Sequence, residues 1–249
     1  MTNEDIGRRG FEQGTDRYER ARPGYSREAL DRLCAQAGIG EGARVLDLAA
    51  GTGKLTRSLV ERGAAVVAVE PSAAMRETFA NVTRGVEVHD GTAERIPLPA
   101  ASFDVVTVAQ AFHWFDPEPA LREIARVLRP GGALALVWNE RDERDDFVEG
   151  LHRLVDWPFR IFHDWREELD AAPAFEPAER TVLTWHDELT HDQIVERIST
   201  FSYIAAMEDD PRGELLARAR EMVLTRPEPV RLAYVTDIYV ARRRGPADR

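Results

Sequence analysis

Residues 45–55 read VLDLAAGTGKL, an apolar run that leads into a turn with two glycines. The run is typical of a β-strand covered on both faces, and the turn is typical of a strand that gives way to a helix. Gly51 and Gly53 permit a close approach to the backbone, and the free N–H groups at a helix start attract anionic ligands. The turn therefore predicts a small-molecule site.

The spacing of residues within this turn distinguishes between the kinds of ligand that glycine turns bind. An ATP-binding phosphate loop would need Gly at position 48 and Ser or Thr at position 55, where the chain has Leu48 and Leu55. A dinucleotide fingerprint would need a third small residue near position 56, where Thr56 stands. The pattern excludes this kind of ATP loop and leaves an NAD site as an alternative.

Short apolar runs alternate with segments of helical periodicity on both sides of the turn, which predicts parallel strands joined by crossover helices. Ser26 and the pair Thr190 and Gln193 are typical helix-start residues. We expect an α/β fold with a doubly wound, mostly parallel, seven-stranded Rossmann-like sheet, an antiparallel edge strand and a helical, aromatic lid. The expected strands are 43–48, 65–69, 86–89, 103–109, 133–138, 181–186 and 231–241, and the expected helices include 26–37, 117–129, 192–205 and 211–225.

Polar or glycine-containing segments follow four of the expected strands. They are Asp47-x-Ala49-x-Gly51-x-Gly53 and residues 69–72, 89–94 and 109–114. Over about residues 18–139 the chain thereby resembles the class I S-adenosylmethionine-dependent methyltransferases. Segments 18–25 and 109–115 resemble the small-molecule branch related to the trans-aconitate methyltransferases.

The resemblance implies a role for each strand end. Glu70 lies 19 residues after Gly51, a suitable distance for a carboxylate that accepts both ribose hydroxyls. Asp90 would accept from the adenine amino group, and Asp47 would help to hold the methionine end. The expected cofactor-binding residues are Tyr18, Arg22, Tyr25, Asp47, Ala49, Gly51, Thr52, Gly53, Glu70, Pro71, Met75, Asp90, Thr92, Ala93, Glu94, Ala109, Gln110, Ala111 and Trp114, with Arg22 near the cofactor carboxylate.

Methyl transfer needs two reactants positioned in a dry pocket, and a general base is optional. His113 is the candidate base, because imidazole titrates near neutral pH. The alternative is that His113 and Trp114 only form a wall of the pocket.

The resemblance also divides the chain into segments. We expect an N-terminal arm or lid in 1–25, a cofactor-binding α/β core in 26–140 and an inserted lid segment in 141–178. Late strands and helices in 179–241 would complete the sheet and the acceptor pocket, and 242–249 would form a frayed tail. The aromatic residues between Trp157 and Phe175, together with Phe201 and Tyr203, would either roof the acceptor pocket or pack as a satellite core.

The charge and composition of the chain limit the kinds of partner that it is expected to bind. The chain has 33 Lys and Arg against 44 Asp and Glu, a net charge of −11, which disfavours nucleic acid as a partner. Segment 110–112 reads Gln-Ala-Phe, where enzymes that methylate nucleic-acid bases have an Asn/Asp-Pro-Pro-aromatic run. The apolar runs are too short to span a membrane, no secretory signal precedes the first helix, and we expect a cytoplasmic protein.

The remaining sequence features are one cysteine and scattered histidines. Cys34 falls on the apolar stripe of a helix and is expected as a buried thiol, and the histidine spacing matches no metal site. The sequence therefore predicts a methyltransferase that uses S-adenosylmethionine, acts on a small organic acceptor, slightly favours an oxygen such as a carboxylate, and binds no metal. The alternatives are a non-catalytic protein that binds this cofactor and an NAD-dependent oxidoreductase. The oligomeric state is not predicted.

Overall fold

The computed structural model describes residue 19 and residues 21–155 and 163–245 of the 249-residue chain. Its contacts divide the chain into two compact units. The sheet unit comprises Gly24–Trp138, Asp164–Leu183 and Thr236–Arg249, and the helical unit comprises Met1–Pro23, Asn139–His163 and Thr184–Val235.

The described residues form a seven-stranded sheet with the order β3-β2-β1-β4-β5-β7-β6. The first five strands pair in parallel. Asp142 donates to the carbonyl of Ala233 and Arg243 donates to the carbonyl of Gly132, so β7 runs antiparallel to β5. The expected mostly parallel sheet with an antiparallel addition at its edge is confirmed. The strands are β1 (Arg44–Leu48), β2 (Ala65–Val69), β3 (Glu87–His89), β4 (Phe103–Ala109), β5 (Leu128–Arg141), β6 (Glu179–Leu189) and β7 (Val230–Arg242).

The strand order reverses between β1 and β4, because the chain passes from β1 outward to β3 before it returns to β4. Open α/β sheets bind ligands at such a switch point, beyond the carboxyl ends of the strands. Leu48 of β1 is in register with Val69 of β2 and with Val108 of β4. The segments that follow these three strands therefore begin side by side.

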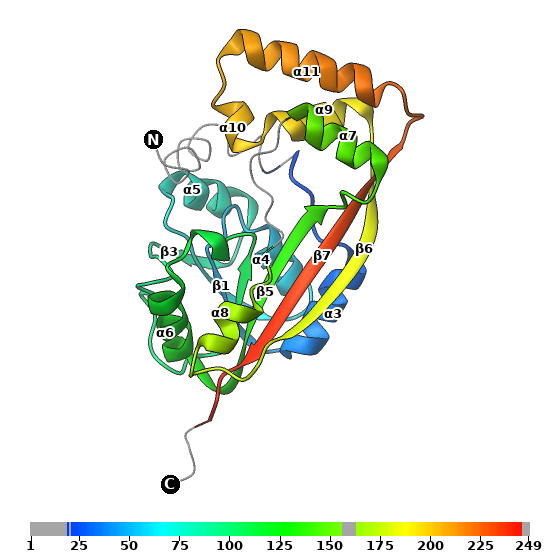
Figure 1. The fold of residues 1–249 in the computed structure, drawn as a ribbon. Helices are drawn as coiled ribbons and strands as arrows, with labels where there is room; N and C mark the ends of the chain where they lie inside the picture. Colours follow the sequence, from blue (N-terminus) through cyan, green and yellow to red (C-terminus); the bar gives the residue numbers. More distant parts are fainter. Residues whose placement is uncertain (1–18, 20, 156–162, 246–249) are drawn as a thin grey trace. The chain divides into compact units, whose positions relative to one another are not determined.

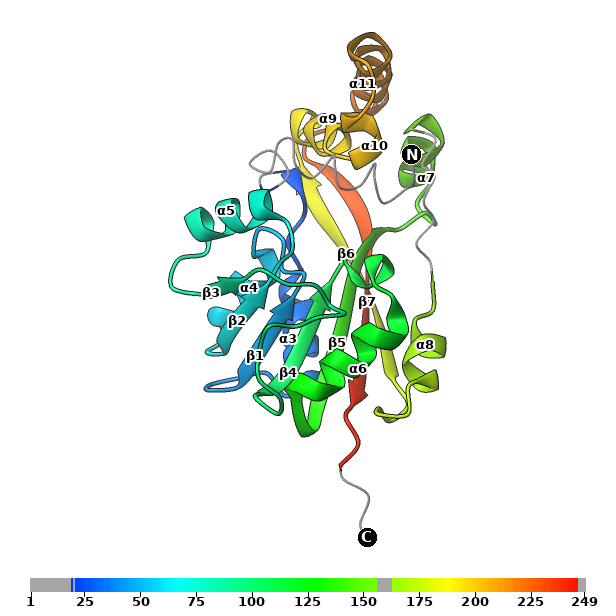
Figure 2. The ribbon, with the colours of Figure 1, turned by 90° about the vertical axis from the view of Figure 1, so that its left-hand side faces the viewer.

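Helices cover both faces of the sheet unit (Figures 1 and 2). Alternate residues of β5 (Ala133, Ala135 and Val137) pack with the apolar sides of α3 and α4, which contribute Leu33 and Leu59. In both views α6 lies on the opposite face from α3. The helices of this unit are α3 (Arg27–Ala37), α4 (Lys54–Val60), α5 (Ala73–Val82), α6 (Pro117–Val127) and α8 (Arg166–Ala171), with a 3-10 turn η1 at Phe112–Trp114.

The start of α3 is confirmed by a capping hydrogen bond, whereas the end of α6 differs from the prediction. The Ser26 hydroxyl accepts from the amide of Ala29 at 3.1 Å, and Gly38 ends α3 in the left-handed conformation. The predicted helix over 117–129 is too long, since α6 ends at Val127 and Leu128 already pairs with Phe103 as the first residue of β5. Leu128 fits the helical stripe, but its pairing with β4 takes precedence.

The helical unit holds α7 (Asp146–Val155), α9 (His191–Ser199), α10 (Ser202–Ala205) and α11 (Asp209–Val223). Thr190 and Gln193 form the expected capping box at the start of α9. The single helix predicted over 192–205 is instead two helices that flank the buried Phe201. α7 was not predicted, although Phe147, Leu151 and Val155 give it an apolar stripe. Among the described residues, no helix is long and apolar enough to cross a membrane.

The late aromatic residues that the structure describes pack as core. In the sheet unit, Trp165 stacks on Trp138 with ring centroids 5.2 Å apart and meets Phe112 edge to face. Phe175 is 1% exposed, and Phe201 is 3% exposed within the helical unit. These residues are therefore buried, which agrees with packing as core. Trp157, Phe159 and Phe162 lie outside the described residues.

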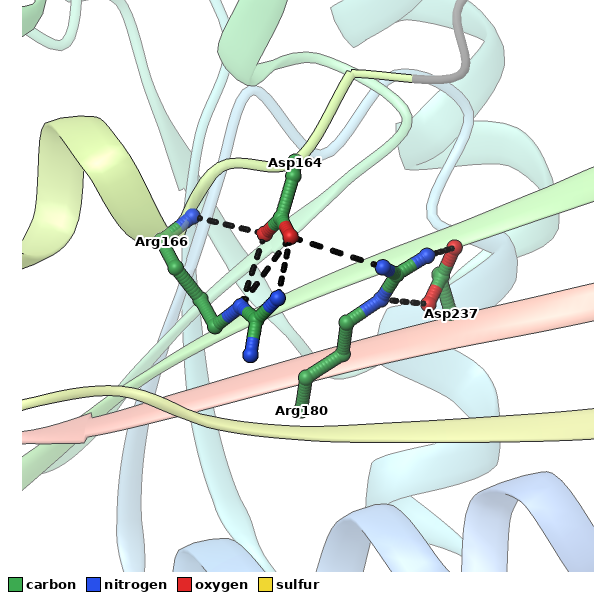
Figure 3. A network of polar contacts seen from close by, with 4 residues as sticks. All are labelled: Asp164, Arg166, Arg180 and Asp237. Atoms are coloured by element: carbon green, nitrogen blue, oxygen red, sulfur yellow. Dashed lines mark hydrogen bonds and ion pairs between the residues drawn. The ribbon is translucent and has the colours of Figure 1, made fainter.

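A chain of ion pairs joins the start of α8 to β6 and β7 (Figure 3). Arg180 donates to both carboxylate oxygens of Asp237 at 2.8 Å, and its other edge lies 3.5 Å from Asp164, which Arg166 also contacts. These cations lower the pKa of Asp164 to about 2. The network anchors the segment that carries Trp165.

Residues 242–244, the first three of the segment that was expected to fray, are instead paired through their backbone. Arg242 is the last residue of β7, the Arg243 amide donates to Gly132 at 2.7 Å, and the Arg244 amide donates to Ala174 at 2.8 Å. Backbone pairing holds these three arginines, which the sequence alone marks only as a basic cluster.

Candidate active site

The glycine turn after β1 has one open position and one packed position. Gly51 has φ 58°, and in the part of the chain that the structure describes no atom lies within 4 Å of the place where its Cβ would be. At Gly53, with φ 84°, a Cβ would meet the Thr83 hydroxyl at 2.4 Å and the Phe79 ring at 2.7 Å. Gly53 is therefore required by packing, whereas Gly51 leaves room for a ligand against the backbone.

The carboxylate of Glu70 lies against this turn. Its Oε2 accepts from the Gly51 amide at 2.9 Å and its Oε1 accepts from the Ser72 amide at 2.8 Å. Glu70 is 6% exposed, and burial raises its pKa above the ordinary value even though the two amides and Arg76 oppose the shift. Each carboxylate oxygen has a second lone pair, so Glu70 can still accept from a ligand.

Asp47 lies on β1 and is fully buried. Its two oxygens accept from the hydroxyls of Thr56, at 2.5 Å, and Thr107, at 2.9 Å. Burial raises the pKa of Asp47 to about 6 despite these hydrogen bonds. The carboxylate thereby links β1 to α4 and to β4. These links hold the glycine turn, which connects β1 to α4, in place.

At the end of β3, Asp90 is mostly exposed and pairs with Arg76 of α5, with Nη1 3.0 Å from Oδ1. The same Nη1 lies 2.8 Å from the carbonyl oxygens of Glu70 and Pro71. Arg76 therefore joins the ends of β2 and β3, a connection that the sequence analysis missed.

At the end of β4, Gln110 has φ 58°, a left-handed conformation that non-glycine residues seldom adopt. Ala49, at the end of β1, shares this conformation with φ 56°. Such backbone strain, of order 1–3 kcal/mol per residue, concentrates at functional sites.

The candidate base follows this strained residue. His113 lies in η1, and its Nδ1 is buried with no hydrogen-bond partner among the described residues. Burial lowers the pKa of His113 to about 4, so the ring is neutral at pH 7. Its ring centroid lies 4.6 Å from that of Trp114, which is 38% exposed.

Comparison with known proteins identifies the family to which the chain belongs. A profile described as a methyltransferase domain matches residues 46–136. Over 217 residues the chain is 41% identical to an uncharacterized methyltransferase of Mycobacterium tuberculosis, a match that covers 87% of this chain and 86% of that protein. The chain belongs to the methyltransferase family.

The family extends across distant organisms. An uncharacterized methyltransferase of Schizosaccharomyces pombe is 31% identical to this one, over 88% of this chain and 89% of that protein. A solved structure from Anaeromyxobacter dehalogenans, assigned as a type II methyltransferase, is 29% identical with a TM-score of 0.67 and covers 90% of this chain and 99% of that chain. This methyltransferase has the class I fold, and its cofactor is S-adenosylmethionine. The open backbone at Gly51 and the adjoining carboxylate of Glu70 fit an adenosyl group.

The structure brings several predicted site residues of this methyltransferase together. Gly51, Glu70 and the capped start of α5, where Met75 is 4% exposed, are connected by hydrogen bonds. Thr52 is 2% exposed, and its carbonyl accepts from Arg57 and Thr83. These contacts hold the turn to α4 and to the residue that follows α5.

The remaining predicted residues at the strand ends follow β2, β3 and β4. Thr92 is exposed and Ala93 is buried beside it, whereas Glu94 accepts from the amide of Asp116. Pro71 is exposed, and Ala111 is 8% exposed.

The expected arm is divided between the two units. Tyr25 packs against the core of the sheet unit, Arg22 belongs to the helical unit, and Tyr18 lies outside the described residues.

Sequence reasoning missed the residues that support the site from other elements. Thr56 was considered only as an obstacle to a dinucleotide, but it donates to Asp47. Thr107 carries a hydroxyl in the middle of an apolar strand, and that isolated polar residue was the available signal. Arg76 lies on the surface of α5, and a surface arginine on a helix gives no sequence signal of a role in a site.

Proposed function

We propose that this methyltransferase transfers the methyl group of S-adenosylmethionine to a small organic acceptor, with an oxygen such as a carboxylate favoured. The observation that carries the proposal is the buried Glu70 carboxylate beside the open Gly51 backbone, at the point where the strand order reverses. A carboxylate in that place suits the two hydroxyls of a ribose.

The proposed cofactor roles follow the strand ends. Glu70 binds the ribose, Asp90 accepts from the adenine amino group, and the backbone of Thr92 and Ala93 meets the ring edge. Asp47 holds the glycine turn in place and contributes negative charge toward the methionine end. At pH 7 a carboxyl with a pKa of about 6 is mostly ionised, which supports that contribution.

The resemblance of segments 18–25 and 109–115 to the trans-aconitate methyltransferases supports an acidic acceptor. The acceptor for which those enzymes are named is a carboxylic acid, which is ionised at pH 7.

A carboxylate acceptor needs no general base, because it is already ionised at pH 7. As the carboxylate oxygen bonds to the methyl carbon, the carbon–sulfur bond breaks and its electron pair stays on sulfur. We assign His113 to the wall of the pocket, since a base with a pKa of about 4 is poorly matched to neutral pH. Catalysis then comes from the positioning of two reactants.

A panel of acids, each paired with its amide, tests the proposal through the release of S-adenosylhomocysteine. We expect turnover with one or more acids and none with the matching amides.

The alternatives give different results in the same experiments. Turnover of amines or phenols alone would contradict the acid preference. Binding of S-adenosylhomocysteine without turnover of any acceptor would indicate a non-catalytic binding protein. Calorimetric binding of NAD in place of S-adenosylhomocysteine would overturn the cofactor assignment.

A further inference from the structure

Arg76 connects three groups on the adenosine side of the candidate site. Its Nη1 lies 2.8 Å from the carbonyl oxygens of Glu70 and Pro71 and 3.0 Å from Oδ1 of Asp90. The side chain of Arg76 is 22% exposed, whereas that of Asp90 is 72% exposed. One half-buried cation therefore holds an exposed carboxylate against the turn that follows β2.

The turn that Arg76 contacts is already held from its other side. The Glu70 carboxylate accepts from Gly51 and Ser72, and the Ser72 hydroxyl accepts from the Met75 amide to begin α5. Arg76 adds bonds to the backbone carbonyls of this turn, so the position of the Glu70 backbone is set independently of its carboxylate.

Stability alone does not explain this arrangement. Ion pairs between exposed groups contribute little to folding, because water screens them and ordering the side chains costs entropy. The contact with Arg76 occupies Oδ1 of Asp90 and favours one orientation of its carboxylate. A preordered group binds a ligand more tightly than a mobile one, since its ordering cost is met before binding.

We propose that Arg76 is a positioning residue for adenosine recognition: it fixes the Asp90 carboxylate and the Glu70 turn before the cofactor binds. The inference rests on the proposed adenine and ribose roles of Asp90 and Glu70. Arg76 acts through these two residues and need not touch the ligand. All three contacts are made by one nitrogen, Nη1, so a lysine, which keeps the charge on a differently shaped side chain, should restore the role only in part.

The experiment compares the binding of S-adenosylhomocysteine with that of S-inosylhomocysteine, which carries a carbonyl oxygen where adenine carries the amino donor. The ratio of the two Kd values reports adenine recognition. Calorimetry on the full-length chain gives both constants for wild type, Arg76→Gln, Arg76→Lys and Asp90→Asn. Arg84→Gln, an exposed arginine just after α5, is the matched control.

We expect Arg76→Gln to weaken S-adenosylhomocysteine binding about 10-fold, to reduce the preference for adenine, and to change the unfolding temperature little. Arg76→Lys should recover part of the affinity, and Arg84→Gln should match wild type. A purely structural role would lower both affinities equally together with the unfolding temperature, and that result would overturn the inference.

Asp90→Asn separates the two hypotheses. If this variant loses the adenine preference while Arg76→Gln and Arg76→Lys retain wild-type affinity and preference, then Asp90 recognises adenine and the role of Arg76 is refuted. If Asp90→Asn keeps the full preference, the proposed role of Asp90 is itself wrong, and the inference about Arg76 falls with it. Should Arg76→Gln fail to fold, the ratio of the two Kd values measured for Arg76→Lys tests the role of Arg76 by itself: a reduced adenine preference supports it, and a wild-type ratio overturns it.

Discussion

The amide nitrogen of Gly51 lies 2.9 Å from Oε2 of Glu70, and this hydrogen bond joins the turn after β1 to the end of β2. The two residues are 19 positions apart in the chain, with α4 and β2 between them. Because β1 and β2 are parallel and in register, their carboxyl ends deliver the open backbone and the carboxylate to one place. A ligand with hydroxyl donors would meet both at once.

Glu70→Gln should weaken the binding of S-adenosylhomocysteine. The substitution removes the charge and turns one acceptor into a donor beside an amide that also donates, which we expect to cost about 1.5–3 kcal/mol of binding free energy. Calorimetry measures the loss. Glu77→Gln, at an exposed position of α5, is the control and should bind as wild type does. Equal affinities for wild type and Glu70→Gln would contradict the ribose role.

Alanine at the two glycines of the turn should have different effects. Gly53→Ala should destabilise the fold by roughly 2 kcal/mol or more, because its Cβ would overlap Thr83 and Phe79 and its φ is positive. Gly51→Ala has space and should cost only about 1 kcal/mol of stability, but its methyl group would occupy the ligand's place. Thermal unfolding and cofactor binding, measured on both variants, check this separation. Similar losses in both measurements for both variants would refute it.

Asp47→Asn should remove a pH dependence of stability. The pKa of Asp47 in the fold, about 6, is above its ordinary value of 3.8, so its contribution is greatest below pH 3.8 and is lost as pH rises through 6. Between pH 4 and 7 the wild-type free energy of unfolding should fall by roughly 2.4 kcal/mol relative to the variant. Urea unfolding at several pH values tests this, and parallel curves would show that the carboxyl titrates normally.

His113→Asn should leave most of the turnover of an acidic acceptor intact. With a pKa near 4, His113 does not change charge between pH 6 and 8, so kcat should be flat over that range in wild type. A variant rate within about 10-fold of wild type supports the wall role. A loss of about 100-fold, with a rate that follows a single ionisation, would restore His113 as the general base.

The prediction of the parallel strands depended on local features. Apolar runs bounded by turns located β1 to β4 within one or two residues, and Ser26 and Thr190 marked helix starts correctly. The end of α6 was misplaced because Leu128 satisfies both the helical stripe and the strand pairing. α7 was missed because a charged run precedes it.

The sequence by itself determined the class of the fold, the glycine turn and the acidic strand ends, since these depend on neighbours only a few positions away and on the periodicity of apolar residues. Only the tertiary structure decided which side chains complete the site. Thr107 reaches Asp47 across paired strands, Thr56 reaches it from a helix, and Arg76 reaches Asp90 from another. Such contacts form between residues that chain folding brings together, and the energy of each depends on burial and geometry that no local pattern encodes.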